Sequence, residues 1–359
     1  MHDTAILIGR FEPVHQGHMA LLRHGLAQAR EAIVVLGSAW QARSPKNPFT
    51  WQERAEMVLG ALPEADRPRV RFLPVRDYYN EAVWVQAVRQ GVAALLAPAW
   101  PGGAAPRIGL VGHFKDATSS YLSRFPGWDL MDLERQGSID ATAIRDTLFG
   151  AAPATVDSAL APLADDIPPS TLDFLRRFAR QPSFLALQEE WRMLRGYRAA
   201  WSTAPYPPVF VTVDAVLRCQ GHVLLIRRAH APGKDLWAVP GGFIEPRETL
   251  WQSCLRELAE ETHCPLPEAT LRAALRQVAV FDHPDRSQRG RTITHAHFFD
   301  LQDIPLPAVL GGDDALQAQW VPLDRLAAME DQFFEDHFHM LDQFLQLTDK
   351  AALARCLPP

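Results

Sequence analysis

The stretch GRFEPVHQGH (Gly9–His18) decides how the first half of this chain folds. It follows a short apolar run, Ala5–Ile8, and leads into a segment with helical spacing. Glycines permit a tight turn and let backbone N–H groups approach a ligand closely. Histidine N–H groups and the fixed charge of Arg10 can bind phosphate oxygens. The stretch therefore predicts a phosphate-binding turn at the carboxyl end of a first strand.

The rest of the first half alternates strand and helix patterns, which predicts an α/β domain with a Rossmann-like parallel sheet covered on both faces. Ligands of such sheets bind beyond the carboxyl ends of the strands, where Gly9–His18 lies. The expected strands are Ala5–Ile8, Ala32–Gly37, Val70–Val75, Ile108–Val111 and Trp128–Leu133.

The second half has a different pattern, which predicts a separate domain. From Val209 the chain shows short alternating strands, interrupted by one helix near Thr249–Thr262. This is typical of an α+β fold. We place the first domain at residues 1–201, a proline-rich linker at 202–208 and the second domain at 209–359.

Composition limits the partners and the compartment. The chain is 47% hydrophobic and 22% charged, and its net charge of -6 gives no footprint for nucleic acid. Four scattered cysteines argue against a zinc site or disulfides and fit a reducing compartment. No signal-peptide pattern and no run of ~18 apolar residues occur. We expect a cytoplasmic protein without nucleic-acid or membrane partners; a homo-oligomer stays open.

Five segments together resemble the archaeal-type nicotinamide mononucleotide (NMN) adenylyltransferases of the nucleotidylyltransferase superfamily. Gly9–His18 is similar to their (H/T)-x-G-H signature. The other four are Lys46–Met57, Asp77–Val85, Val111–Asp116 and Ser138–Leu148. The resemblance implies that NMN attacks the α-phosphate of ATP, giving NAD and pyrophosphate. Because the attacking phosphate is already anionic, catalysis would consist of positioning and charge neutralisation.

The same resemblance implies which residues bind the substrates. His15, His18 and Arg145 would act on the triphosphate as the catalytic groups, while Asn80 and Trp84 would bind NMN. The full expected ATP set is Gly9, Arg10, Phe11, His15, His18, Thr142 and Arg145.

Some of these positions have simpler explanations. Trp84 could be a core aromatic, and Thr142 a helix N-cap with Arg145 solvated. Asp140 stands where the family has serine, which puts one phosphate contact in doubt.

The second half carries a carboxylate-rich helix. Within Pro240–Cys264, the residues Glu257 and Glu261 fall on the same helical stripe as the apolar residues, and Glu260 lies on the adjoining flank. Carboxylates placed together repel one another and resist desolvation. A hard divalent cation resolves both problems, so we expect Mg²⁺ there, with Mn²⁺ as an alternative. The simpler explanation is a helix that frays into solvent after Leu258.

This stretch resembles the Nudix box of nucleoside diphosphate hydrolases. The positions that match at the family's spacing are Gly242, Glu248, Arg256, Glu257, Leu258, Glu260 and Glu261. The resemblance implies metal binding by Glu257, Glu260 and Glu261, with Glu248 supporting the loop. His263 departs from the usual glycine and Cys264 from the final bulky position.

Two later segments, Val280–Thr294 and Gly311–Leu326, resemble ADP-ribose pyrophosphatases. They imply that Phe281 stacks on a base and that Arg286 or Arg291 meets phosphates; a polar hairpin loop is an equally good explanation.

The whole chain thus resembles a bacterial fusion of NMN adenylyltransferase with a Nudix hydrolase that cleaves ADP-ribose to AMP and ribose 5-phosphate. Two rivals stay open. The second domain could be a Nudix-like sensor of ADP-ribose, or the first could adenylylate another phosphorylated acceptor.

Overall fold

The computed structural model describes residues 1–99, 106–113, 124–134, 140–302 and 304–348. The predicted segments at 114–116 and 138–139 lie outside these residues. The chain divides into two compact units, Met1–Gln188 and Glu189–Asp349. The division falls inside one helix, and the linker at 202–208 remains a prediction. In the described part of the chain, no helix is both long and apolar enough to traverse a bilayer.

Unit 1 is built on a five-stranded parallel sheet in the order β3-β2-β1-β4-β5, which confirms the predicted Rossmann-like sheet and its five strands. Its strands are β1 (His2–Gly9), β2 (Ala29–Leu36), β3 (Val70–Pro74), β4 (Ile108–Gly112) and β5 (Asp129–Asp132). Its helices are α1 (Gln16–Gln28), α2 (Trp51–Gly60), α3 (Glu81–Leu96), α4 (Ala141–Gly150), α5 (Val156–Leu160) and α6 (Pro169–Phe178), and α7 (Pro182–Ala200) begins in it.

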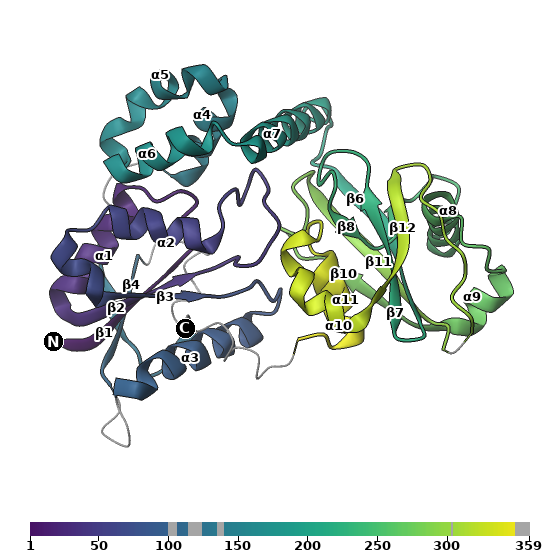
Figure 1. Cartoon of the computed structure of the whole chain (residues 1–359), viewed down its shortest axis with the longest axis horizontal. Helices are drawn as coiled ribbons and strands as arrows, with labels where there is room; N and C mark the ends of the chain where they lie inside the picture. Colours follow the sequence, from purple (N-terminus) through teal and green to yellow (C-terminus); the bar gives the residue numbers. More distant parts are fainter. Residues whose placement is uncertain (100–105, 114–123, 135–139, 303, 349–359) are drawn as a thin grey trace. The chain divides into compact units, whose positions relative to one another are not determined.

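Helices cover both faces of this sheet (Figure 1). On one face, Val88 and Val92 of α3 pack against Ile6 and Ile33 of the central strands. On the other, α1 lies so close that a Cβ on Gly25 would sit 3.0 Å from the Cβ of Ala5. Successive side chains of a strand point to opposite faces of the sheet. Because both faces are covered, each strand is a continuous apolar run in the sequence.

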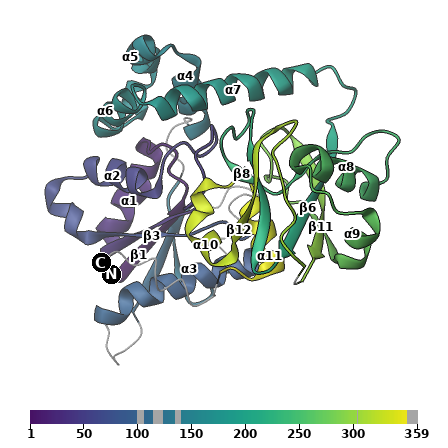
Figure 2. The same cartoon turned by 45° about the vertical axis from the view of Figure 1, so that its right-hand side comes forward.

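The helices α4, α5 and α6 gather beside the sheet in both Figure 1 and Figure 2. Aromatic rings hold them together and onto the loop before α2. Phe178 of α6 lies 5.0 Å from Phe49, and Phe149 of α4 stacks on Phe184 at 5.7 Å, measured between ring centroids. The amide of Gln188 donates to the carbonyls of Phe149 and Ala151. These contacts fix the C-terminal end of α4, the helix that carries Arg145.

Unit 2 is the predicted α+β fold, with a mixed sheet in the order β10-β11-β6-β7-β12; β8 pairs with β7 and β9 with β6. Its strands are β6 (Val209–Cys219), β7 (His222–Arg228), β8 (Trp237–Ala238), β9 (Gly241–Phe243), β10 (Leu275–Phe281), β11 (Arg291–Asp300) and β12 (Ala315–Pro322). Its helices are α8 (Leu250–Thr262), α9 (Glu268–Ala274), α10 (Leu323–Leu326) and α11 (His337–Leu345).

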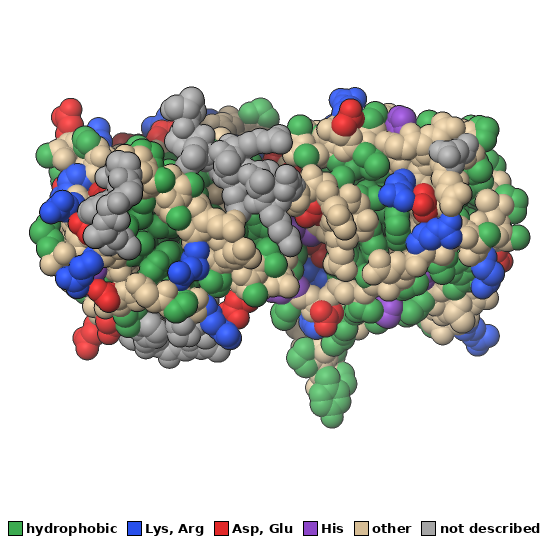
Figure 3. Space-filling view, turned by 90° about the horizontal axis from the view of Figure 1, so that it is seen from below, with side chains coloured by type: hydrophobic (Ala, Val, Ile, Leu, Met, Phe, Trp, Pro, Cys, Tyr) green, Lys and Arg blue, Asp and Glu red, His purple; other side chains and the backbone are tan. Residues whose placement is uncertain are grey.

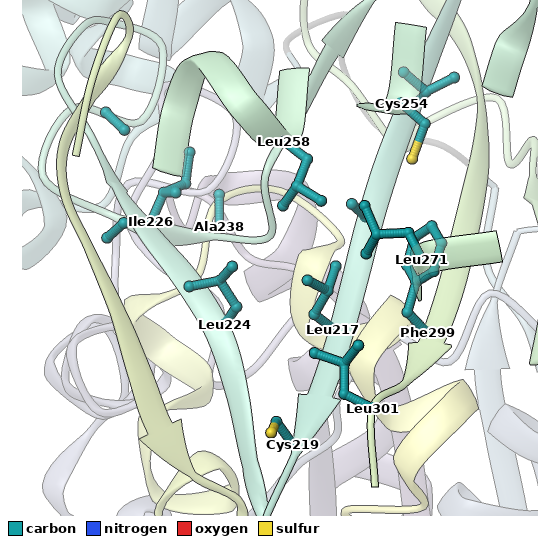
Figure 4. Packing of buried hydrophobic residues seen from close by; sticks show 14 of the residues in the cluster. Leu217, Cys219, Leu224, Ile226, Ala238, Cys254, Leu258, Leu271, Phe299 and Leu301 are labelled. Carbon is teal, nitrogen blue, oxygen red and sulfur yellow. The ribbon is translucent and has the colours of Figure 1, made fainter. Parts of the chain in front are cut away.

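Two apolar clusters lie on opposite faces of this sheet. One contains Cys254 and Leu258 of α8 packed against Leu217 and Leu224 (Figure 4). The other contains Phe338 and its neighbours in α11. The predicted stripe on α8 is therefore its buried side, and the helix that carries the carboxylates is anchored to the sheet.

Charged side chains are scattered on the face drawn in Figure 3. Basic and acidic groups alternate there, and the visible blue atoms form no continuous patch.

Candidate active sites

The loop after β1 ends in two histidines that begin helix α1. His15 is the N-cap, and its Nδ1 accepts a hydrogen bond from the N–H of Gly17 at 3.2 Å. The Nδ1 of His18 accepts from the N–H of His15 at 3.3 Å. Each ring in its neutral form therefore carries its proton on Nε2. The backbone fixes both histidines as Nε2–H donors at the positive end of a helix, which is an arrangement suited to phosphate.

The rings of these histidines lie together. Their centroids are 3.8 Å apart, and Phe11 packs on His18 at 4.4 Å. Burial, followed by the neighbouring His15, lowers the pKa of His18 well below its ordinary value. His18 is therefore neutral near pH 7 and acts as a hydrogen-bond donor rather than a fixed charge. A bound anion would favour its protonation.

Beneath the loop lies a buried ion pair that the sequence did not reveal. The carboxylate of Glu12 lies 3.2 Å from the Nε of Arg54, and these side chains are 2% and 1% exposed. Arg54 also donates to the carbonyls of Arg10 and Gly37 at 2.6 and 2.7 Å. Burial raises the pKa of Glu12, while the charge of Arg54 opposes that shift and favours the ionised pair. Arg54 thus joins the loops after β1 and β2.

We expect Arg54→Met to destabilise unit 1 by about 3–5 kcal/mol, because it removes one partner of a buried pair and leaves loop carbonyls without a donor. Urea denaturation followed by circular dichroism would measure this. The matched control is Arg177→Met, which breaks an exposed pair with Glu56 and should cost about 0–1 kcal/mol. Equal losses in the two variants would show that Arg54 is not the link between the loops.

Helix α4 brings Arg145 to the same loop. Its Nη1 donates to the carbonyl of Glu12 at 2.5 Å, and its Nη2 lies 3.1 Å from the hydroxyl of Thr142. The structure therefore brings Arg145, Thr142 and the loop together. The N-cap of α4 is Asp140, whose carboxylate accepts from the N–H of Ala143 at 2.9 Å. The departure from serine keeps the cap and adds a negative charge, so Thr142 is not the cap.

The residues expected to bind NMN lie one turn apart at the start of α3. Asn80 is the N-cap, and its Oδ1 accepts from the N–H of Val83 at 3.1 Å, which leaves its amide NH₂ to donate. Trp84 is partly buried against the core and lies 6.1 Å from Phe125 in an edge-on arrangement. Asn80 thus caps the helix in addition to any role in binding. Trp84 contacts the core, as the simpler explanation expects.

In unit 2, β9 leads through a loop to helix α8, which starts at Thr249 with a reciprocal capping pair to Gln252. The helix ends at His263, whose φ of 48° is left-handed. Glycine is preferred in that conformation. The Nδ1 of His263 lies 3.1 Å from the carbonyl of Leu310, a hydrogen bond that glycine could not make. The departure from the family glycine therefore changes only the helix exit.

Glu261 is the most buried carboxylate of α8, with 2% of its surface exposed. Its Oε2 accepts a hydrogen bond from the N–H of Gly241 at 2.8 Å. Burial raises the pKa of Glu261 to about 8, and the charge of Glu257 adds to the shift. Burial also raises the pKa of Glu257. Without a cation, Glu261 therefore keeps its proton near pH 7.

Arg256 organises the other carboxylates. Its guanidinium donates to Glu248 at 3.0 Å, to Glu257 at 2.8 Å and to Glu260 at 3.0 Å. It also donates to the carbonyl of Phe243 at 3.1 Å, which ties α8 to β9. Glu248 additionally accepts a hydrogen bond from the hydroxyl of Ser253.

The carboxylates of α8 are ligands of the type that a hard cation prefers. Among the described residues, no three His, Cys, Asp or Glu side chains converge on a metal-sized point. Glu257 and Glu260 instead bond Arg256. The donors are nevertheless oxygen atoms, and burial destabilises the charged forms of Glu257 and Glu261. Mg²⁺ and Mn²⁺ prefer such ligands and would stabilise the charged forms.

The close approach of β9 to α8 depends on Gly242. A Cβ there would lie 2.7 Å from the carboxyl group of Glu257. We expect Gly242→Ala to displace Glu257 and lower hydrolysis by about tenfold or more, because a shift of ~1 Å in a catalytic group can cost ~100-fold. A steady-state assay measures this. Gly196→Ala is the control, since a Cβ there meets nothing within 4 Å. Unchanged hydrolysis by Gly242→Ala would mean that Glu257 has no role in the reaction.

The residues expected to bind ADP-ribose take structural positions. Arg286 is 5% exposed, and its guanidinium makes two hydrogen bonds of 2.8 Å to Asp336. Arg286 is therefore held in a buried ion pair, and its contact with phosphate stays a prediction. Arg291 donates to the carbonyl of Asp282 and so braces its own loop. Phe281 is partly buried against the core, and its ring centroid lies 6.1 Å from that of Phe344 in an edge-on arrangement.

Comparisons with known proteins match both units of the chain. The NUDIX domain family matches residues 208–344, and the Cytidylyltransferase-like family matches residues 6–88. The nicotinamide/nicotinic acid mononucleotide adenylyltransferase of Acinetobacter baylyi is 35% identical over 191 residues, which are 53% of this chain and 94% of that protein. The nicotinamide-nucleotide adenylyltransferase of Thermococcus kodakarensis is 40% identical over 90 residues, so the chain spans about half of that relative's length (48%) and the match covers 24% of this chain.

One solved structure matches nearly the whole chain. It is a bifunctional NMN adenylyltransferase/ADP ribose pyrophosphatase from Francisella tularensis, complexed with AMP and a manganese ion. It is 33% identical, has a TM-score of 0.87, and covers 96% of this chain and 99% of its own. A second crystal structure of such a protein from the same organism matches with a TM-score of 0.86. Because both units and their order match, the chain belongs to the family of bifunctional NMN adenylyltransferases with a Nudix hydrolase domain.

Proposed function

We propose that unit 1 transfers the adenylyl group of ATP to NMN, giving NAD and pyrophosphate, and that unit 2 hydrolyses ADP-ribose to AMP and ribose 5-phosphate with Mg²⁺. The observation that carries the first activity is the pair of Nε2–H donors, His15 and His18, at the start of α1. The buried Glu261 beside Glu257 carries the second.

In unit 1 the chain supplies donors and fixed charge rather than a base. His15 and His18 donate hydrogen bonds to phosphate oxygens, and Arg10 and Arg145 neutralise the charge that grows on the leaving pyrophosphate. The attacking oxygen belongs to an NMN phosphate that is already ionised. Asp140 adds a negative charge at the N-terminal end of α4, and Arg145 has to offset that charge as well.

In unit 2 the residues that would hold the cation are Glu257, Glu260 and Glu261. A divalent ion bound there supplies charge neutralisation and a more acidic water. The role of Arg256 is to keep Glu257 and Glu260 on the side of α8 that faces β9. Gly241 orients Glu261 through its N–H, and Glu248 anchors Arg256.

Product identification tests both activities. Purified protein with Mg²⁺ should convert ATP plus NMN to NAD and pyrophosphate, and should convert ADP-ribose to AMP and ribose 5-phosphate, as separated by ion-exchange chromatography. Binding of ADP-ribose without cleavage would favour the sensor alternative. Failure with NMN but turnover of another phosphorylated acceptor would favour the second rival.

We further propose that the two domains act separately. Fragments 1–201 and 204–359 should each fold and keep one activity. The second fragment lacks Glu190, which accepts from the N–H of Gly233, and Arg198, which donates to the carbonyl of Gln288. A fragment starting at Glu189 keeps both contacts and should therefore melt at a higher temperature. Loss of activity in every fragment would contradict separate action.

A further inference from the structure

Two arginines that the box motif does not include lie side by side in unit 2. Arg228 ends β7, and its guanidinium carbon is 4.2 Å from the ring centroid of Phe334. The guanidinium carbon of Arg289, from the loop before β11, is 5.9 Å from the same ring and 4.9 Å from that of Phe243. Aromatic faces hold guanidinium groups flat, so the two rings place two cations together.

This cluster is adjacent to the carboxylates of α8. The charge of Glu261 acts on Arg228, and the backbone carbonyl of Phe243 accepts a hydrogen bond from Arg256. Strand β9 is therefore adjacent both to the cation pair and to the carboxylates of α8.

The two cations repel each other. Burial, followed by the charge of Arg289, lowers the pKa of Arg228. Glu335, whose charge acts on Arg228, is a buried acid that has other partners. Glu335 is further engaged by Ser287 and the N–H of Gln288, at 2.9 and 3.0 Å. An anion placed here would relieve the repulsion between the cations.

Arg289 also has an unused donor. Its Nε is buried and has no hydrogen-bond partner within the part of the chain that the structure describes. Buried donors of charged groups are nearly always paired, because leaving one unpaired is costly. Arg286, a few residues earlier, shows the contrast, since Asp336 occupies two of its donors.

We propose that Arg228 and Arg289 form a clamp for the diphosphate of the substrate and press it against the box carboxylates. The clamp takes the phosphate role that the sequence suggested for Arg286 and Arg291. It rests on the proposed function, since it names the residues that select a diphosphate-linked substrate over an uncharged nucleoside.

The test compares Arg289→Met and Arg289→Lys with wild type. The matched control is Arg272→Met, because Arg272 also lies over a ring, that of Trp251 at 4.7 Å, but is exposed and already paired with Glu268. The measurements are KM and kcat for ADP-ribose, inhibition of hydrolysis by AMP and by adenosine, and calorimetric binding of ADP-ribose in EDTA. Binding by unit 1 is common to all variants and cancels in the differences. Thermal melting checks the fold.

We expect Arg289→Met to raise KM for ADP-ribose, the inhibition constant of AMP and the dissociation constant in EDTA by about 10- to 100-fold, the effect of losing a charge-assisted hydrogen bond. The Lys variant should recover part of this. Inhibition by adenosine and all values of Arg272→Met should stay within about twofold of wild type.

Unchanged constants in a folded Arg289→Met protein, or equal losses for AMP and adenosine, would overturn the clamp. If wild type does not cleave ADP-ribose, the proposed function fails. The binding difference in EDTA then still decides whether the clamp holds phosphate.

Discussion

His18→Ala should lower NAD formation by about 10²- to 10³-fold, while ADP-ribose hydrolysis stays within about twofold of wild type. The structure gives the reason: the Nδ1 of His18 is engaged by the N–H of His15, so its Nε2–H is a donor held at the start of α1. Alanine removes that donor. A coupled assay for NAD measures the loss.

A second substitution separates the donor from ring packing. His18→Phe retains an aromatic ring beside Phe11 but has no N–H, so it should be as slow as alanine. His18→Asn can donate from its side-chain amide and should be faster than both. Near-normal NAD formation by a folded His18→Ala protein would remove His18 from the site.

Glu261→Gln should lower ADP-ribose hydrolysis by about two orders of magnitude or more, because a metal-binding carboxylate is replaced by a neutral amide. The amide oxygen can still accept from the N–H of Gly241, so the fold is preserved. Steady-state turnover with Mg²⁺ measures the effect. Hydrolysis at the wild-type rate would contradict a role for Glu261, and NAD formation should not change.

The same variant has a signature in stability without metal. The pKa of Glu261 is raised from 4.5 to about 8 in the folded protein. Between these values the folded state retains a proton that the unfolded state has released, so wild-type stability falls as pH rises. The Gln variant lacks this loss. In EDTA its melting temperature should therefore exceed that of wild type by a margin that grows from pH 5 to pH 8.

The sequence predicted the fold well where local patterns were strong. All five strands of unit 1 occur within a few residues of the expected positions, because parallel strands buried on both faces are continuous apolar runs. Helix α8 begins after the Thr249 cap, and its stripe buries Cys254 and Leu258 as expected. Periodicity and capping depend on residues close together in the chain, so these elements could be predicted from the sequence alone.

Ion pairs between residues far apart in the chain could not be predicted from the sequence. Glu12 and Arg54 lie 42 positions apart in the chain, and Arg286 and Asp336 lie 50 apart. Nothing local indicates that such charges meet in the interior. The arginines of a polar loop look equivalent in the sequence, and only the fold shows that Arg286 is paired while Arg289 lies over aromatic rings. Arg228 was missed because it ends an ordinary strand.

Rates of both reactions in both variants show most directly whether one chain carries two independent chemistries. His18→Ala and Glu261→Gln should be assayed together with wild type, each with ATP plus NMN and with ADP-ribose. Each variant should lose only its own reaction and keep the other within about twofold of wild type. Loss of both reactions in either folded variant, or loss of the opposite one, would contradict it.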